Sequence, residues 1–338
     1  DPGCPSSTSH AVPDKAFSLS PKIQCESLTL NTSGYLRTVE KRPLRKRIKY
    51  FALYWFVRFL LAFSNALPRR WWLAFCGFLG KIAYATSPPT RERVIRHLGL
   101  AYAGELSTRQ IVDLARRVFV MLGKNAGDIF RSSQVRSRAQ LDKFLVTHGY
   151  EHFEAANAKG KGVIFLTCHL GAFDLQITNM AMRGLQPNII GTALKDARLN
   201  ELLVEYRNAH GAIAIERGKE TFRLIKALKS GGSVAILIDQ DTKVKSRFVQ
   251  FFGMQAATPV GAAVLAMKTG AAIVPTIVHL GSDHKQHMEI FPALPVVVTG
   301  DDEKDMVENT QVFTDFIEQQ IRRFPDQWVW MHERWKTR

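Results

Sequence analysis

The sequence predicts an α/β fold in which helices flank a mixed, mainly parallel sheet. Short continuous apolar runs, such as 162–167 and 233–238, are typical of strands that are buried on both faces. Stretches of helical periodicity separate these runs, as at 196–210 and 219–229. The chain has 338 residues, of which 46% are hydrophobic, so it is long enough to bury a large core. Alternating strands and helices of this kind build an α/β layer.

Three segments of different composition divide the chain. Residues 1–40 are rich in Ser, Thr and Pro, which predicts a disordered tail or residues added to the natural chain. Segment 41–90 begins with six cations between Lys41 and Lys49 and continues with two aromatic-rich apolar runs. Residues 91–338 contain the alternating helices and strands and are expected to form the main domain.

The basic and aromatic composition of 41–90 predicts a helical segment that associates with a membrane. Spanning a bilayer takes about 20 apolar residues, and the first run is borderline in length. Arg58 lies near its middle, which costs about 2.5–3.5 kcal/mol on insertion scales. Cations beside Trp, Tyr and Phe suit the headgroup region of an anionic leaflet. A single span, a hairpin and a surface helix all fit, and the alternative is a pair of buried helices behind a basic patch.

The charge and the cysteines restrict the class of protein further. Lys and Arg number 46 and Asp and Glu 30, so the net charge of +16 favours anionic partners such as lipid headgroups, phosphorylated substrates or nucleic acid. The four cysteines lie far apart without a C-x-x-C pair, which argues against a disulfide scaffold or a structural zinc site. The chain has neither G-x-G-x-x-G nor a Walker A motif, which argues against dinucleotide or nucleoside-triphosphate chemistry.

The remaining elements follow from periodicity. Ser107 is expected to cap a helix that continues through Leu122. The other expected strands are 188–192, 212–215, 272–279 and 286–291, and the other expected helices are 259–268 and 305–324.

Function in such sheets sits at the carboxyl ends of strands, where His169 follows the run 162–167. Asp174 comes five residues later, and Gly171 permits the turn that would bring the two together. The carboxylate could then accept the Nδ1–H bond and leave Nε2 as a base. No G-x-S-x-G elbow is present, so such a base would deprotonate a substrate hydroxyl directly. The alternative is an ordinary structural hydrogen bond.

Two further strand ends carry polar candidates. Arg217 follows 212–215, where it could bind a phosphate together with a helix N-terminus or belong to a solvated charge cluster. Asp239 follows 233–238 and could cap a turn or orient an arginine or a hydroxyl. Phe251 and Phe252 could line an acyl-chain groove or belong to the core. The pattern from Asp283 to Glu289 mimics metal-ligand spacing, but a strand hairpin would place these side chains on both faces, so no metal site is expected.

These segments together resemble the lipid A biosynthesis acyltransferases, the lauroyl and myristoyl transferases within the lysophospholipid-acyltransferase group. The resemblance is collinear over residues 50–338. Its motifs are Thr167-Cys-His169-Leu-Gly-Ala-Phe-Asp174, Arg207-x-x-x-Gly211 with Arg217-Gly218, Leu237-Ile-Asp239-Gln240, Phe251-Phe-Gly253 with Thr258-Pro, and the closing segment Pro325-Asp-Gln-Trp328-Val-Trp330-Met-His332-Glu-Arg334-Trp335-Lys336. The closing segment is the most specific of them.

The resemblance implies a glycerolipid-acyltransferase-like fold and a catalytic domain at 91–338. It implies acyl transfer from an acyl-carrier-protein or coenzyme A thioester to a hydroxyl of lipid A or a related glycolipid, in lipopolysaccharide synthesis at the cytoplasmic face of the bacterial inner membrane. His169 would be the base and Asp174 its orienting carboxylate. Arg217 would lie near the headgroup or thioester, and Asp239 and Gln240 would support the site. No metal and no cofactor besides the acyl donor are implied, and the positive charge would attract the membrane and an acidic carrier protein.

Other functions stay open. The protein could acylate a lysophospholipid or a mannosylated phosphatidylinositol, hydrolyse acyl thioesters or lysophospholipids, or bind lipid without catalysis. A nucleic-acid-binding protein is disfavoured, because no RNA-binding fingerprint is present and the cations flank apolar segments.

Overall fold

The computed structural model describes residues 43–186, 188–191, 194, 196–209, 213–216 and 221–337. The chain divides into two units, residues 1–52 and 53–338, and the boundary falls within helix α2 (Leu44–Phe63). Of the first unit, the structure describes only residues 43–52. The predicted tail, 1–40, lies outside the described residues, and the predicted segment limits at 40 and 90 stay predictions.

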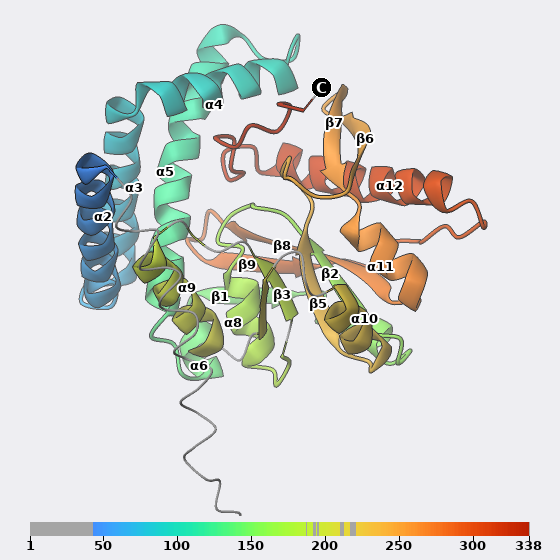
Figure 1. Cartoon of the computed structure of the whole chain (residues 1–338). Helices are drawn as coiled ribbons and strands as arrows, with labels where there is room; N and C mark the ends of the chain where they lie inside the picture. Colours follow the sequence, from blue (N-terminus) through green and yellow to red (C-terminus); the bar gives the residue numbers. More distant parts are fainter. Residues whose placement is uncertain are drawn as a thin grey trace, which may run out of the picture. The chain divides into compact units, whose positions relative to one another are not determined.

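The second unit is built on a seven-stranded sheet with the strand order β1-β9-β8-β2-β5-β3-β4 (Figure 1). Every neighbouring pair is parallel except β8 and β9, which are antiparallel. The predicted mixed, mainly parallel sheet is therefore confirmed. Its strands are β1 (Leu145–His148), β2 (Val163–Thr167), β3 (Asn188–Gly191), β4 (Ile213–Glu216), β5 (Ser233–Leu237), β8 (Ala272–Leu280) and β9 (Gln286–Ile290).

Helices flank this sheet, as the sequence predicts. Ser107 caps α5 in a capping box: its hydroxyl accepts a hydrogen bond from Gln110 N, and the Gln110 side chain accepts one from Ser107 N. The sequence did not predict β1, α7 or α8, which are short and lack a clear apolar period. The helices of this unit, besides the C-terminal part of α2, are α3 (Arg69–Thr86), α4 (Pro88–Ala101), α5 (Thr108–Ser132), α6 (Arg138–Leu141), α7 (Tyr150–Asn157), α8 (Leu175–Ala181), α9 (Ala197–Ala209), α10 (Thr221–Lys229), α11 (Gly261–Thr269) and α12 (Asp302–Arg323).

Strand β2 lies at the centre of two apolar clusters. Ile164 and Leu166 belong to a cluster that includes residues of α5, α11 and α12, whereas Val163 and Phe165 belong to one that includes residues of α7 and α8. Alternate side chains of a strand point to opposite faces, so β2 is buried on both faces. The sequence of β2 is continuously apolar because both of its faces are buried.

A separate hairpin, β6 (Ser246–Phe251) and β7 (Met254–Pro259), packs beside α12. Its two turn residues, Phe252 and Gly253, have φ values of 53° and 70°. Two positive φ values in succession are typical of the type I′ turn that matches the twist of a hairpin. Phe251 and Phe252 are both buried, so they belong to the core, and the alternative of an exposed groove-lining loop is wrong.

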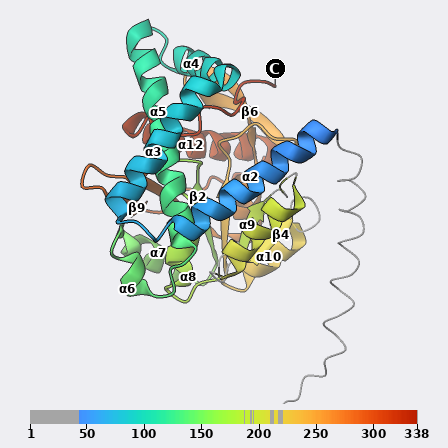
Figure 2. The same ribbon diagram turned by 90° about the vertical axis from the view of Figure 1, so that its left-hand side faces the viewer.

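Helices α3 and α5 lie side by side in both views of the molecule (Figures 1 and 2). They approach closely because glycines face the partner backbone. A Cβ atom on Gly80 would lie 2.2 Å from the carbonyl oxygen of Phe119, and one on Gly123 would lie 2.2 Å from that of Cys76. Within the described parts of the chain, no helix has the length and hydropathy needed to cross a bilayer.

The close contact between α3 and α5 predicts the effect of a side chain at position 80. Gly80→Val is expected to lower the free energy of unfolding by about 3 kcal/mol, because the backbone of Phe119 must move away. Gly99→Ala on α4 is the control: its added Cβ would meet Ile111 at 4.0 Å, an ordinary contact. The control should leave stability unchanged or raise it by about 0.5–1 kcal/mol. Urea unfolding followed by circular dichroism measures both, and equal stabilities would contradict the packing described.

Candidate active site

His169 and Asp239 meet at the carboxyl ends of two neighbouring strands. Strands β2 and β5 are parallel, and Thr167 pairs with Leu237 in their register. Each of the two polar residues lies two positions beyond this last pair, so both leave the sheet at the same level. His169 Nδ1 is 2.9 Å from Asp239 Oδ1, and the backbone N–H of His169 donates to Asp239 Oδ2 at 2.8 Å.

The carboxylate of Asp239 is buried and ionised. Burial by itself would raise the pKa of Asp239, but the charge of His169 and the hydrogen bonds from His169 and Trp328 outweigh it and lower the pKa to about 2. An ionised carboxylate accepts hydrogen bonds and donates none. Nδ1 of His169 therefore carries a proton, and in the neutral ring the lone pair is on Nε2. The His169 side chain is 25% exposed, so substrate can reach the ring.

Gly171 makes the turn that follows His169. Its φ is 61°, and a Cβ atom at this position would lie 2.0 Å from the carbonyl oxygen of Val278. The turn also presents backbone groups to the C-terminal segment: Gly171 N donates to Gln327 O, and Val329 N donates to His169 O. Leu170 and Trp328 form an antiparallel bridge. The segment around Trp328 therefore runs along the loop that holds the histidine.

Trp328 completes the hydrogen bonding of Asp239. Its indole Nε1–H donates to Asp239 Oδ2 at 2.8 Å. The residues after it are held at Asp241, whose carbonyl oxygen accepts from Lys336 Nζ at 2.9 Å and whose carboxylate accepts from Thr337 N at 2.9 Å. Sequence analysis did not place Trp328 in the site. The motif of the closing segment, 325–336, is the sequence signal that could have identified Trp328 as a site residue.

The structure assigns the Nδ1 hydrogen bond differently from the sequence analysis. Asp174 was expected to accept it, and Asp239 accepts it instead, because the parallel register of β2 and β5 brings Asp239 level with the ring. Asp174 is the N-cap residue of α8 and is buried. Gln240 follows Asp239 and is half-buried. Arg217 lies outside the described residues.

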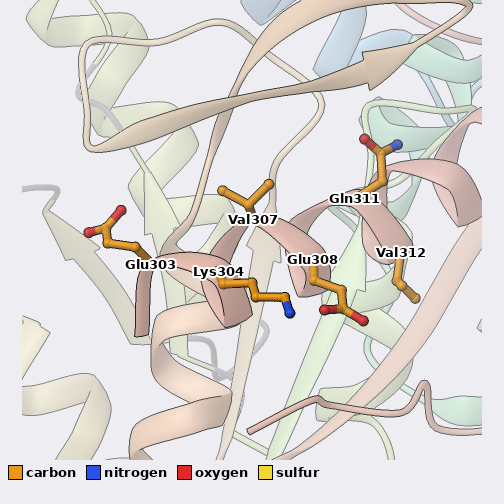
Figure 3. Close-up of a pocket in the computed structure, with 6 residues that line it drawn as sticks. All are labelled: Glu303, Lys304, Val307, Glu308, Gln311 and Val312. Atoms are coloured by element: carbon orange, nitrogen blue, oxygen red, sulfur yellow. The ribbon is translucent and has the colours of Figure 1, made fainter. Parts of the chain in front are cut away.

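Other features of the described residues do not extend this site. No group of three or more His, Cys, Asp or Glu side chains among them is arranged to hold a metal ion. A concavity of about 640 Å³ lies on α12 and is lined by Glu303, Lys304, Val307, Glu308, Gln311 and Val312 (Figure 3). None of the predicted site residues lines it.

The adjacent thiol is unsuited to nucleophilic attack. Cys168 is fully buried, and this burial together with the charge of Asp239 raises its pKa well above the usual range. A thiol that stays protonated is a poor nucleophile. A partly exposed histidine beside a buried carboxylate is the arrangement of a candidate general base, which could take a proton from a hydroxyl of a substrate.

Comparison with known proteins identifies the kind of group transfer. Residues 39–337 match the family of bacterial lipid A biosynthesis acyltransferases, and the chain belongs to this family. The protein is therefore an acyltransferase, as the sequence analysis predicted.

Three relatives illustrate the similarity. The chain is 27% identical over 221 residues to the phosphatidylinositol mannoside acyltransferase of Mycobacterium tuberculosis H37Rv, covering 63% of this chain and 67% of the relative. It is 27% identical over 266 residues to the lipid A biosynthesis lauroyltransferase of Escherichia coli K12, covering 78% and 84%. It is 25% identical over 236 residues to the lipid A biosynthesis acyltransferase of Haemophilus influenzae, covering 69% and 71%.

The pairing of His169 with Asp239 predicts the effect of two substitutions on kcat. His169→Ala removes the candidate base and is expected to lower kcat by about 10²–10⁴-fold. Asp239→Asn removes the charge that holds the Nδ1 proton and is expected to lower kcat by about 10³-fold or more. Thiol release from an acyl thioester, in the presence of bacterial lipid extract, measures both rates.

Two exposed positions on the β8–β9 turn supply matched controls. His284→Asn suits the positive φ at that position, and Asp283→Asn removes an exposed carboxylate. Both should keep kcat within about twofold, since surface changes of this kind shift free energies by less than about 0.5 kcal/mol. Near-normal activity of Asp239→Asn would show that the pair is structural.

Proposed function

We propose that the protein is a membrane-associated O-acyltransferase. It moves a fatty acyl chain from an acyl-carrier-protein or coenzyme A thioester to a hydroxyl of lipid A or a related glycolipid. The His169–Asp239 pair at the carboxyl edge of β2 and β5 is the observation that carries the proposal, because it provides a base for a hydroxyl in a chain of this family.

The proposed reaction needs no covalent intermediate on the enzyme. Nε2 of His169 takes the proton of the acceptor hydroxyl as the oxygen forms a bond to the thioester carbonyl carbon. The tetrahedral intermediate then collapses, the C–S bond breaks, and the Nε2 proton passes to the leaving sulfur. The ionised Asp239 stabilises the imidazolium between these two steps, since its carboxylate is 2.9 Å from Nδ1.

Asp174 has a proposed supporting role in the same loop. It lies five residues after His169, and its carboxylate is buried at the start of α8. We propose that Asp174 helps to hold the loop that carries His169. In this proposal Asp239 orients the ring and Asp174 supports the site, the reverse of the roles expected from the sequence.

The proposed acceptor is a phosphorylated glycolipid. The relatives include acyltransferases for lipid A biosynthesis and for phosphatidylinositol mannoside. Both acceptors present sugar hydroxyls beside phosphate. We propose that Arg217 binds the phosphate, because a guanidinium group can form two parallel hydrogen bonds with a phosphate. Lipid A and a mannosylated phosphatidylinositol are thus the two acceptors to be compared.

The proposed donor is an anionic thioester that approaches over exposed lysines. Lys243 is exposed in the segment that follows Asp239, and Lys245, which is also exposed, lies 3.8 Å from the carboxylate of Glu303. Four residues of chain span at most about 14 Å, so the Cα of Lys243 lies within that distance of the Cα of Asp239. Positive charge so close to the site would attract the phosphates of coenzyme A or an acidic carrier protein.

The proposed membrane contact is an exposed stripe on α3. Trp71, Phe75, Phe78 and Ile82 recur at helical spacing, and Trp71 and Phe78 are 72% and 57% exposed. The opposite face of α3, with Trp72 and Cys76, is buried. A contiguous apolar surface of this kind marks an interaction site. We therefore propose that it lies in the headgroup region of a membrane, at the cytoplasmic face of the bacterial inner membrane.

The exposed stripe predicts the effect of polar substitutions on membrane binding. The double variant Trp71→Ser/Phe78→Ser is expected to lower the partition coefficient by at least about 10-fold, because each aromatic side chain loses about 1.5–3 kcal/mol of transfer free energy. Sedimentation with vesicles of anionic and zwitterionic phospholipid measures the binding. Phe222→Ser on α10 is the control, since Phe222 is 79% exposed but lies outside the stripe. Equal losses in both variants would remove the support for this contact.

A single assay tests the proposed reaction. Detergent-solubilised full-length protein is incubated with lipid A precursor, phosphatidylinositol mannoside or lysophospholipid, and with acyl-carrier-protein or coenzyme A thioesters. Mass spectrometry is expected to show one glycolipid that gains one acyl mass with wild-type protein and with His284→Asn, but not with His169→Ala. Because only one acceptor and one donor should react efficiently, the same experiment identifies both.

Each other result of this assay contradicts the proposal in a specific way. Acylation of lysophospholipid alone would make the protein a phospholipid acyltransferase. Release of free fatty acid without a new lipid would make it a hydrolase. Binding of lipid without either product, while a lipid A acyltransferase control is active, would favour a non-catalytic lipid-binding protein.

A further inference from the structure

The hydrogen bond from Trp328 to Asp239 affects the imidazole ring of His169. We infer that Trp328 is a positioning residue: its indole N–H holds the Asp239 carboxylate in place and disperses its charge, and so sets the basicity of His169. This inference rests on the proposed role of His169 as the base. No part of it depends on which lipid or thioester reacts.

The two oxygens of Asp239 have different partners. Oδ1 is 2.9 Å from Nδ1 of His169, while Oδ2 accepts from the backbone N–H of His169 and from the indole of Trp328, each at 2.8 Å. Without the indole, Oδ2 would keep only the backbone donor, which comes from the same residue as the ring. Trp328 thus supplies the one of these three donors that lies outside the loop 168–174, and it holds the carboxylate from the C-terminal segment.

The indole itself is held rigidly. Trp328 is 2% exposed, and its ring contacts the ring of Trp330 edge to face, with centroids 4.7 Å apart, and that of Phe251 with centroids 5.8 Å apart. Its backbone forms a bridge with Leu170. A donor fixed on both sides needs no reorganisation when charge develops on the imidazole, which is the property of a preorganised polar site.

The other charged and titratable groups near Asp239 have separate anchors. Arg334 is fully buried and donates to Ala257 O and Thr258 Oγ1, and burial lowers its pKa to about 10, so it stays cationic. Burial lowers the pKa of His332, which contacts the carbonyl oxygen of Asp241, and it raises that of Cys168. Lys336 is bound at Asp241 as well. Removing the indole donor changes none of these contacts directly.

Loss of the indole N–H should change the pKa of His169 in a defined direction. A carboxylate with one donor fewer has a higher charge density on its oxygens and a greater proton affinity. It then stabilises the imidazolium more strongly, so the pKa of His169 should rise. At the same time kcat should fall, because the carboxylate can rotate out of line with Nδ1.

The test measures the pKa of His169 without any substrate. Diethylpyrocarbonate modifies neutral imidazole, and peptide mass spectrometry reports His169 and His332 separately. The variants are Trp328→Phe and an isosteric replacement of Trp328 by benzothienylalanine, which lacks only the N–H. Trp72→Phe is the matched control, because its buried indole donates to Gly127 O and not to Asp239. Thermal unfolding of each protein is recorded in parallel.

We expect half-modification of His169 to shift upward by about 0.5–1 pH unit in both Trp328 replacements and to stay unchanged in Trp72→Phe. The pH profile of kcat/KM should shift in the same direction. A lower unfolding temperature without a pH shift in the benzothienylalanine protein would overturn the inference and leave Trp328 as a core residue. Because the modification needs neither donor nor acceptor, its result stands even if the proposed acyl transfer fails.

Discussion

The Asp239 carboxylate is ionised although it is buried, and the arrangement of the site follows from this constraint. A buried charge that lacks partners destabilises a fold by several kcal/mol, so every donor around it must be in place. Two donors come from His169, on the loop that follows β2, and one comes from Trp328 near the C-terminus. The C-terminal segment therefore has to return to the end of β2, and it does so by pairing with the loop at Leu170. The site is therefore complete only when the C-terminal segment lies against this loop.

The two faces of helix α3 have different roles. Glycines such as Gly80 let α3 approach the backbone of α5, so this face is determined by close packing. The other face exposes Trp71 and Phe78. Packing within the described residues does not require these two side chains to be apolar. The proposed function needs both faces. The first holds α3 rigidly against α5, and the second contacts the membrane that contains the acceptor lipid.

The local pattern predicted much of the sheet and both members of the candidate pair. Continuous apolar runs identified β2 and β5, and the rule that function follows strand ends identified His169 and Asp239 separately. Their partnership was missed, because the sequence offered a nearer carboxylate in Asp174. The packing of the whole sheet decides which strands lie beside β2. The order β8-β2-β5 therefore cannot be predicted from the local sequence pattern. The hairpin of Phe251 was also missed, because the first residue of its turn has a positive φ without being glycine.

The sequence by itself determined the class of fold, the family and the residue that we propose as the base. These depend on periodicity, on motifs and on strand ends, which are all local properties of the chain. Only the tertiary structure decided that Asp239 orients His169 and that Trp328 holds Asp239. Residues 169, 239 and 328 come from three distant parts of the chain. They meet because parallel strands end at a common edge and because the buried carboxylate there needs donors that neither strand can supply alone.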